Sequence, residues 1–62
     1  MTDIEKHIEA AKHLEAAARH HREAAKHLEE GNPDKAHHSM LKALAHSQHA
    51  AEIQKEHLMA WI

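Results

Sequence analysis

Ten histidines occur in a chain of only 62 residues, several times the ordinary usage of this residue. Imidazole is the side chain that takes up a proton near neutral pH, and its nitrogens suit Zn²⁺, Ni²⁺ and Cu²⁺. No cysteine is present, so thiolate metal sites and disulfides are excluded. The chemistry to look for is therefore metal binding or proton uptake by histidine alone.

Three histidines recur at seven-residue spacing, at His13, His20 and His27. On a helix, successive members would lie about 10.5 Å apart along the axis, too far for one metal ion to join two of them. His46 and His49 are three residues apart, so on a helix they share one face and could share a metal.

A reversal of the chain at Gly31-Asn32 would bring these two groups together, because residues whose numbers sum to about 63–64 then face each other. His46 and His49 would lie opposite Ala17. We therefore predict a site for Zn²⁺, Ni²⁺ or Cu²⁺ formed by four imidazoles, those of His13, His20, His46 and His49. Glu9 and Glu52 are placed to add a carboxylate ligand or to orient a ring.

Two further groupings are secondary candidates for metal ligands. One lies near the turn and comprises His27, His37 and His38, and the other pairs His7 with His57 near the open end. Two alternatives stay open. His7, His21 and His57 fit partly buried core positions. The three histidines at seven-residue spacing, His13, His20 and His27, fit a solvated surface.

No motif for catalysis accompanies the histidines. Ser39 and Ser47 are isolated, no glycine-rich phosphate loop is present, and the Glu-X-X-His pairs of carboxylate di-iron bundles do not occur. We expect no enzymatic activity and identify no small-molecule substrate.

The elements that must position these residues are helices. Thirteen alanines accompany five Leu, four Ile, three Met and one Trp, with no Val, Phe or Tyr, and this composition favours helix over strand. One Gly and one Pro leave room for a single break. We predict an all-α, antiparallel two-helix hairpin spanning 1–62 as one domain, with helices at about 3–30 and 33–60 and a turn at 31–32.

Local signals define the ends of these helices. Thr2 and Glu5 fit a capping box, in which each side chain bonds the other residue's backbone N–H. Gly31 is the expected left-handed stop, and Asn32-Pro33 is the expected N-cap and first helical position of the second helix.

A heptad pattern predicts the packing. Its a and d positions in the first helix are Ile4, His7, Ala11, Leu14, Ala18, His21, Ala25 and Leu28, widened at g by Ala10, Ala17 and Ala24. The second helix continues the stripe from Ala36 through Met40, Ala43, Ser47, Ala50, Gln54 and His57 to Trp61.

Leu41, Ile53 and Met59 fall outside this stripe and indicate a second packing surface. A hairpin with so few large apolar residues is marginal alone, so we expect a homodimer forming a four-helix bundle. Trp61 and Ile62 are expected to close its open end.

Three resemblances accompany this interpretation. The stretch from Gly31 to Leu44, with small residues at Ala36 and Ala43, resembles the turn and second helix of a tetratricopeptide repeat, which implies the hairpin geometry only. The AAKH segments at 10–13 and 24–27, together with the Gly-Asn turn, resemble small His- and Ala-rich bacterial helical-hairpin proteins, which supply no residue roles. In size and layout the chain is similar to Rop-type RNA-binding hairpins, and this likeness implies a dimeric bundle and nothing further.

Charge and hydropathy limit the kinds of partner that the chain is expected to bind. The net charge is −2 with neutral histidines and would reach +8 if all ten were protonated. Basic residues alternate with Glu and no aromatic platform is present, so we expect no nucleic-acid binding at neutral pH. Without an apolar run of membrane length or a signal-peptide pattern, we expect a soluble, cytoplasmic protein with no membrane contact.

Two functions follow from these expectations. The first is binding of a divalent transition metal for sequestration or metal-assisted assembly. The alternative is a structural or protein-interaction helical module with pH-dependent self-association and no metal role, and the regular heptads also fit a designed or consensus-like scaffold.

Overall fold

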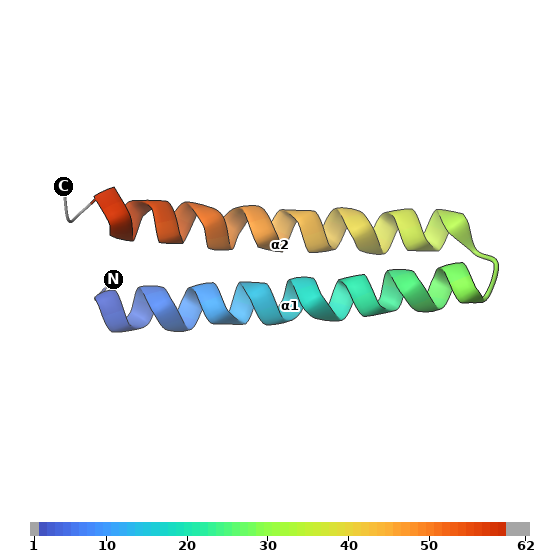
Figure 1. Cartoon of the computed structure of the whole chain (residues 1–62), viewed down its shortest axis with the longest axis horizontal. Helices are drawn as coiled ribbons and strands as arrows, with labels where there is room; N and C mark the ends of the chain where they lie inside the picture. The colour runs from blue at the N-terminus through green and yellow to red at the C-terminus, as the bar shows by residue number, and fades with distance from the viewer. Residues whose placement is uncertain (1, 60–62) are drawn as a thin grey trace.

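Two long helices lie antiparallel to each other over the residues that the structure, a computed structural model, describes, which are 2–59. Helix α1 spans Asp3–Glu29 and helix α2 spans Pro33–Met59. The start of α1 and the end of α2 lie at the same end of the molecule, and the connecting turn lies at the other (Figure 1). The predicted all-α hairpin is confirmed for these residues. The expected helical position of residue 60 and the expected packing of Trp61 and Ile62 lie outside the described residues.

The start of α1 uses Thr2 as its N-cap. The Thr2 hydroxyl oxygen accepts a hydrogen bond from the backbone N–H of Glu5 at 3.1 Å, as the capping box predicts. The Glu5 carboxylate, expected to bond the backbone N–H of Thr2, accepts from the Thr2 hydroxyl at 3.1 Å instead. The hydroxyl thus bonds both groups and fixes the first turn of the helix.

The turn between the helices forms a Schellman motif around Gly31, which has φ of 75°. Gly31 N–H donates to the Leu28 carbonyl at 3.0 Å, and Asn32 N–H donates to the His27 carbonyl at 2.7 Å. These bonds end α1 at Glu29, one residue before the predicted end. Asn32 then caps α2 as predicted, because its side-chain oxygen accepts from the backbone N–H of Lys35 at 3.3 Å.

Small residues make the contact between the helices. The buried residues of the described chain are Ala10, Ala17, Ala36, Ser39, Ala43 and Ala50. On α2 the predicted stripe supplies the contact at Ala36, Ala43 and Ala50, which are buried. On α1 the predicted a/d seam is wrong as the contact with α2, because Leu14 and Leu28 are 45% and 61% exposed and the g-position alanines are buried instead. The alanines face α2 because their small side chains let the two backbones approach closely, whereas leucines at the same positions would hold them apart.

Because α1 is rotated so that its alanines face α2, the hairpin has two different sides. On α1 the buried alanines at heptad position g are flanked by c on one side and by d on the other. The histidine face carries the c-position histidines of α1 and their neighbours: Glu9, His13, His20, Glu23, His27, Lys35, His38, Lys42, His46 and His49. The apolar face carries the apolar residues at the a and d positions of α1 and the apolar residues beside them on α2: Ile4, Ala11, Leu14, Ala18, Ala25, Leu28, Met40, Leu44, Ala51 and Leu58. His7 and His21 occupy the other two d positions of α1 on this side.

Neither α1 nor α2, as far as Met59, contains a stretch long and apolar enough to cross a lipid bilayer.

Candidate functional site

Four imidazole rings meet on the histidine face, near the middle of the hairpin. The closest contact joins Nδ1 of His13 to Nδ1 of His46 at 3.0 Å. One of these two nitrogens must donate and the other accept, so only one of them carries a hydrogen. The contact therefore directs the lone pair of one ring nitrogen at the hydrogen of the other.

The other two rings extend this contact into a cluster. The ring centre of His49 lies 4.9 Å from that of His13, and the ring centre of His20 lies 5.6 Å from that of His46. The rings of His20 and His46 are stacked, with only 11° between their planes. All four histidines predicted from the sequence are thus brought together.

The small residues of the helix contact explain this convergence. Ala17 lies between His13 and His20 along α1, and Ala43 precedes His46 by one turn on α2. Both alanines are buried, Ala43 completely. Because the helices approach closely there, side chains that flank the contact on opposite helices reach each other. The alanines therefore position the histidines.

Carboxylates hold two of the rings from within α1. Oε1 of Glu9 lies 3.5 Å from Nε2 of His13, and Oε2 of Glu23 lies 3.4 Å from Nδ1 of His20. Glu23 also pairs with Nε of Arg19 at 3.8 Å. The contact of Glu9 with His13 agrees with its predicted role, whereas Glu52, the other predicted carboxylate, is exposed. Sequence reasoning missed Glu23, although its spacing of three from His20 was the available signal.

The cluster changes the proton affinity of His46. Desolvation lowers the pKa of His46 below its ordinary value of 6.5, because a charged ring is less well hydrated there. Positive charge on His13, His20, His49 or Arg19 would repel a proton on His46 and lowers the pKa further. At neutral pH His46 is therefore held in the form that has a lone pair available.

As they stand, the side chains of residues 2–59 include no group of three or more His, Asp or Glu arranged to hold a metal ion. The stacking of His20 on His46 is one reason, since parallel rings cannot both direct a lone pair at the same point. The rings instead bond and stack on each other.

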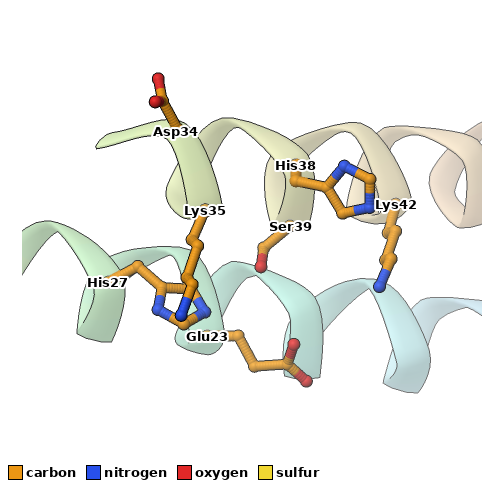
Figure 2. A pocket seen from close by; sticks show the side chains of 7 residues that line it. All are labelled: Glu23, His27, Asp34, Lys35, His38, Ser39 and Lys42. Atoms are coloured by element: carbon orange, nitrogen blue, oxygen red, sulfur yellow. The ribbon is translucent and has the colours of Figure 1, made fainter. Parts of the chain in front are cut away.

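The secondary histidines near the turn divide between the two sides of the hairpin. His27 and His38 line one open hollow of about 370 Å³, together with Glu23, Lys35, Ser39, Lys42 and Asp34 (Figure 2). His37 lines a different, apolar groove with His21. The structure thus does not bring the predicted trio His27, His37 and His38 together.

The side chains around that hollow also disfavour a second metal. Figure 2 shows the Ser39 hydroxyl directed toward α1 between Glu23 and His27, while Asp34 points away. Lys35 and Lys42 line the same hollow, and two ammonium groups oppose the entry of a divalent cation. The hollow has no excess of negative charge to offset them.

The histidines at the open end meet as predicted. The rings of His7 and His57 are 4.7 Å apart between centres in an edge-to-face arrangement. Nδ1 of His57 lies 3.5 Å from Oδ1 of Asp3, which sequence reasoning did not include. The core interpretation of His7 and His21 is wrong, because both are exposed, whereas His57 is partly buried.

Comparison of the chain with protein-family models, with curated proteins and with solved structures gave no match.

Proposed function

We propose that this hairpin binds one divalent transition metal ion, Zn²⁺, Ni²⁺ or Cu²⁺, through the imidazoles of His13, His46, His49 and His20. The metal is either sequestered or used to strengthen the fold. The observation that carries the proposal is the 3.0 Å contact between Nδ1 of His13 and Nδ1 of His46. No catalytic step forms part of the proposal.

This distance is close to what a shared metal requires. Two nitrogens that each bind a tetrahedral metal at about 2.05 Å are about 3.3 Å apart. A metal ion can therefore replace the hydrogen shared by His13 and His46 if the distance between the two nitrogens increases by only about 0.3 Å. His49, whose ring touches that of His13, supplies a third nitrogen after rotation of its ring.

The surroundings of the rings favour metal over protons at neutral pH. A metal competes with protons for the ring nitrogens, so a lowered pKa of His46 reduces that competition. Glu9 lies beside the second nitrogen of His13 and can accept its hydrogen when the first nitrogen binds a metal, as in carboxylate–histidine–metal triads. His20 completes the set once its ring leaves the stack on His46.

Thermal unfolding tests this proposal at pH 7.5, with and without each metal ion, alongside a chelator control. A metal held at 100 times its Kd adds about 2.7 kcal/mol to the free energy of unfolding. For a chain of this length that corresponds to a rise in Tm of about 10 °C or more. A Tm that ignores all three metals contradicts the proposal.

Matched variants locate the site. His46→Ala, and the double variant His46→Ala with His49→Ala, should lose most of the metal-induced rise in Tm. His21→Ala removes an exposed histidine on the other side of the hairpin and should retain the metal-induced rise in Tm. Equal metal-induced rises in His46→Ala and His21→Ala would reject the assigned cluster.

A second candidate function is that of a structural or protein-interaction module, and the exposed apolar side chains favour it. Leu28 and Leu58 are 61% and 65% exposed, which is costly for a chain that remains alone in water. We propose that two hairpins associate as a homodimer in a four-helix bundle. This association is compatible with metal binding and would account for the fold even if no metal binds.

A further inference from the structure

We infer that the apolar face is where the second copy of this chain docks, so that both histidine clusters of the dimer face outward. The inference rests on the proposed self-association and specifies its surface. The competing arrangement would pair the histidine faces, with metal ions bridging the two copies. Four features of the hairpin favour the first arrangement.

The first feature is charge. The apolar face carries no Asp, Glu, Lys or Arg among its defining residues, although 29% of the chain is charged. The titratable side chains beside it in the groove are histidines, His21 and His37. The histidine face carries Glu9, Glu23, Lys35 and Lys42 among its histidines. Burying that face would desolvate several charges, whereas burying the apolar face removes hydrocarbon from water.

The second feature is the weakness of the hairpin's own core. Among the described residues, five alanines and Ser39 are buried, and no large side chain is fully buried. A chain of this length needs further burial to be stable. Because the missing burial is a property of the folded chain itself, the cover must be present whenever the chain is folded. A second copy meets that requirement.

The third feature is size. The hairpin measures 47 × 16 × 12 Å, so its broad side covers about 750 Å². A stable protein–protein interface buries about 800 Å² on each partner. One copy laid along the full length of the apolar face therefore provides an interface of ordinary size, and no larger partner is required.

The fourth feature is a groove in this face near the turn. It has a volume of about 480 Å³ and is lined mainly by apolar groups, including Ala25, Leu28, Pro33 and Met40. Large side chains alternate with alanines along this side of α1, in the order Leu14, Ala18, His21, Ala25 and Leu28. In a two-fold dimer, large side chains of one copy can enter the space beside alanines of the other.

The consequence concerns the metal site. With the apolar faces together, the two clusters around His13 and His46 lie on opposite outer surfaces of the bundle. Each chain then completes its own site without ligands from the partner. The dimer should form in the absence of metal and should bind one metal ion per chain.

The test measures the wild-type protein in a chelating buffer, so its outcome does not depend on metal binding. Sedimentation equilibrium gives the oligomeric state. Methyl relaxation with a soluble paramagnetic agent then reports which side is covered. We expect a dimer in which the methyls of Leu28 and Leu44 relax several-fold more slowly than those of Ala45 and Met59, which are exposed on the other side of α2.

The outcomes are distinguishable. A dimer in which the Ala45 and Met59 methyls are protected would overturn the assignment of the face while leaving self-association intact. A monomer over the whole concentration range would overturn both, and neither result touches metal binding. Neighbouring variants supply a matched pair: Leu44→Glu should abolish the dimer, whether or not the monomer stays folded, and Ala45→Glu should preserve it. A dimer that persists in Leu44→Glu contradicts the inference.

Discussion

His13 occupies the centre of the candidate site because each of its ring nitrogens faces a different group. Nδ1 meets His46 of the other helix, and Nε2 lies 3.5 Å from Glu9 of its own helix. A histidine held from both sides has a fixed ring orientation, which is what a metal ligand requires. His46 has the complementary role, since its neutral form is favoured by its surroundings.

The lowered pKa of His46 has a consequence for stability in acid. In the unfolded chain His46 binds a proton at about pH 6.5, whereas in the folded chain it does so only at lower pH. Between these two pH values the unfolded state binds more protons than the folded state. The contribution of His46 to the free energy of unfolding therefore falls as the pH decreases below 6.5 and then levels off. Above pH 6.5 this contribution does not change. Chemical denaturation at pH 7.5 and 5.5 in chelating buffer measures the effect.

The variant His46→Gln isolates the contribution of this one residue. It should lose less stability between pH 7.5 and 5.5 than the wild type does. His21→Gln, at an exposed histidine on the other side of the hairpin, is the matched control and should lose as much as the wild type. An acid-induced loss in His46→Gln equal to that of the wild type would show that His46 titrates normally.

At the residue scale, the sequence predicted that His13, His20, His46 and His49 meet, but not how their rings lie, and it wrongly grouped His37 with His27 and His38. Helical spacing and the position of the turn suffice to bring His13, His20, His46 and His49 together. The stacking of His20 on His46 and the pairing of His20 with Glu23 depend on side-chain rotamers. Several rotamers fit the same spacing, so these contacts could not be chosen beforehand.

At the scale of the elements, the helix boundaries were predictable to about one residue because each has a local chemical cause. Thr2, Gly31 and Asn32 each form the cap or turn expected of them. The rotation of the helices was not predictable, since alanine and leucine occupy adjacent heptad positions. Periodicity shows that Leu14 and Ala17 lie near one stripe, but it does not show which of them faces the second helix and which faces a second copy.

The alanine contact can be tested with two substitutions on α2. Ala43 is fully buried, and Ala45 is exposed two residues later. Leucine at position 43 must push the helices apart, so Ala43→Leu should lower the free energy of unfolding by about 1–3 kcal/mol. Ala45→Leu should change it by less than about 0.5 kcal/mol. Denaturant unfolding at one fixed protein concentration compares them.

The separation of the helices also bears on the site. Because the close contact brings His13 to His46, Ala43→Leu should weaken metal binding as well as stability. Equal stabilities of Ala43→Leu and Ala45→Leu would show that the alanines do not set the distance between the helices.

At the scale of the whole molecule, the hairpin separates two tasks onto two sides. In the arrangement that we propose, the apolar face provides the burial that the alanine core lacks, and the histidine face concentrates the imidazoles proposed to bind a metal. Heptad spacing produces this division, because positions a and d fall on one side of the alanine contact and position c on the other. In this proposal a chain of 62 residues is stabilised by a second copy and still presents its histidine cluster to solvent.

The most direct test of the central claim is a titration of the protein with Zn²⁺ at pH 7.5, observed through the ¹⁵N resonances of the imidazole rings. Zn²⁺ binding changes the shift of the nitrogen that it contacts, so each histidine reports separately. We predict large changes for Nδ1 of His13 and His46, with further changes for His49 and His20, and saturation at one Zn²⁺ per chain. His21 should stay unchanged. Resonances that do not respond to Zn²⁺, or changes confined to histidines outside these four, would contradict the account.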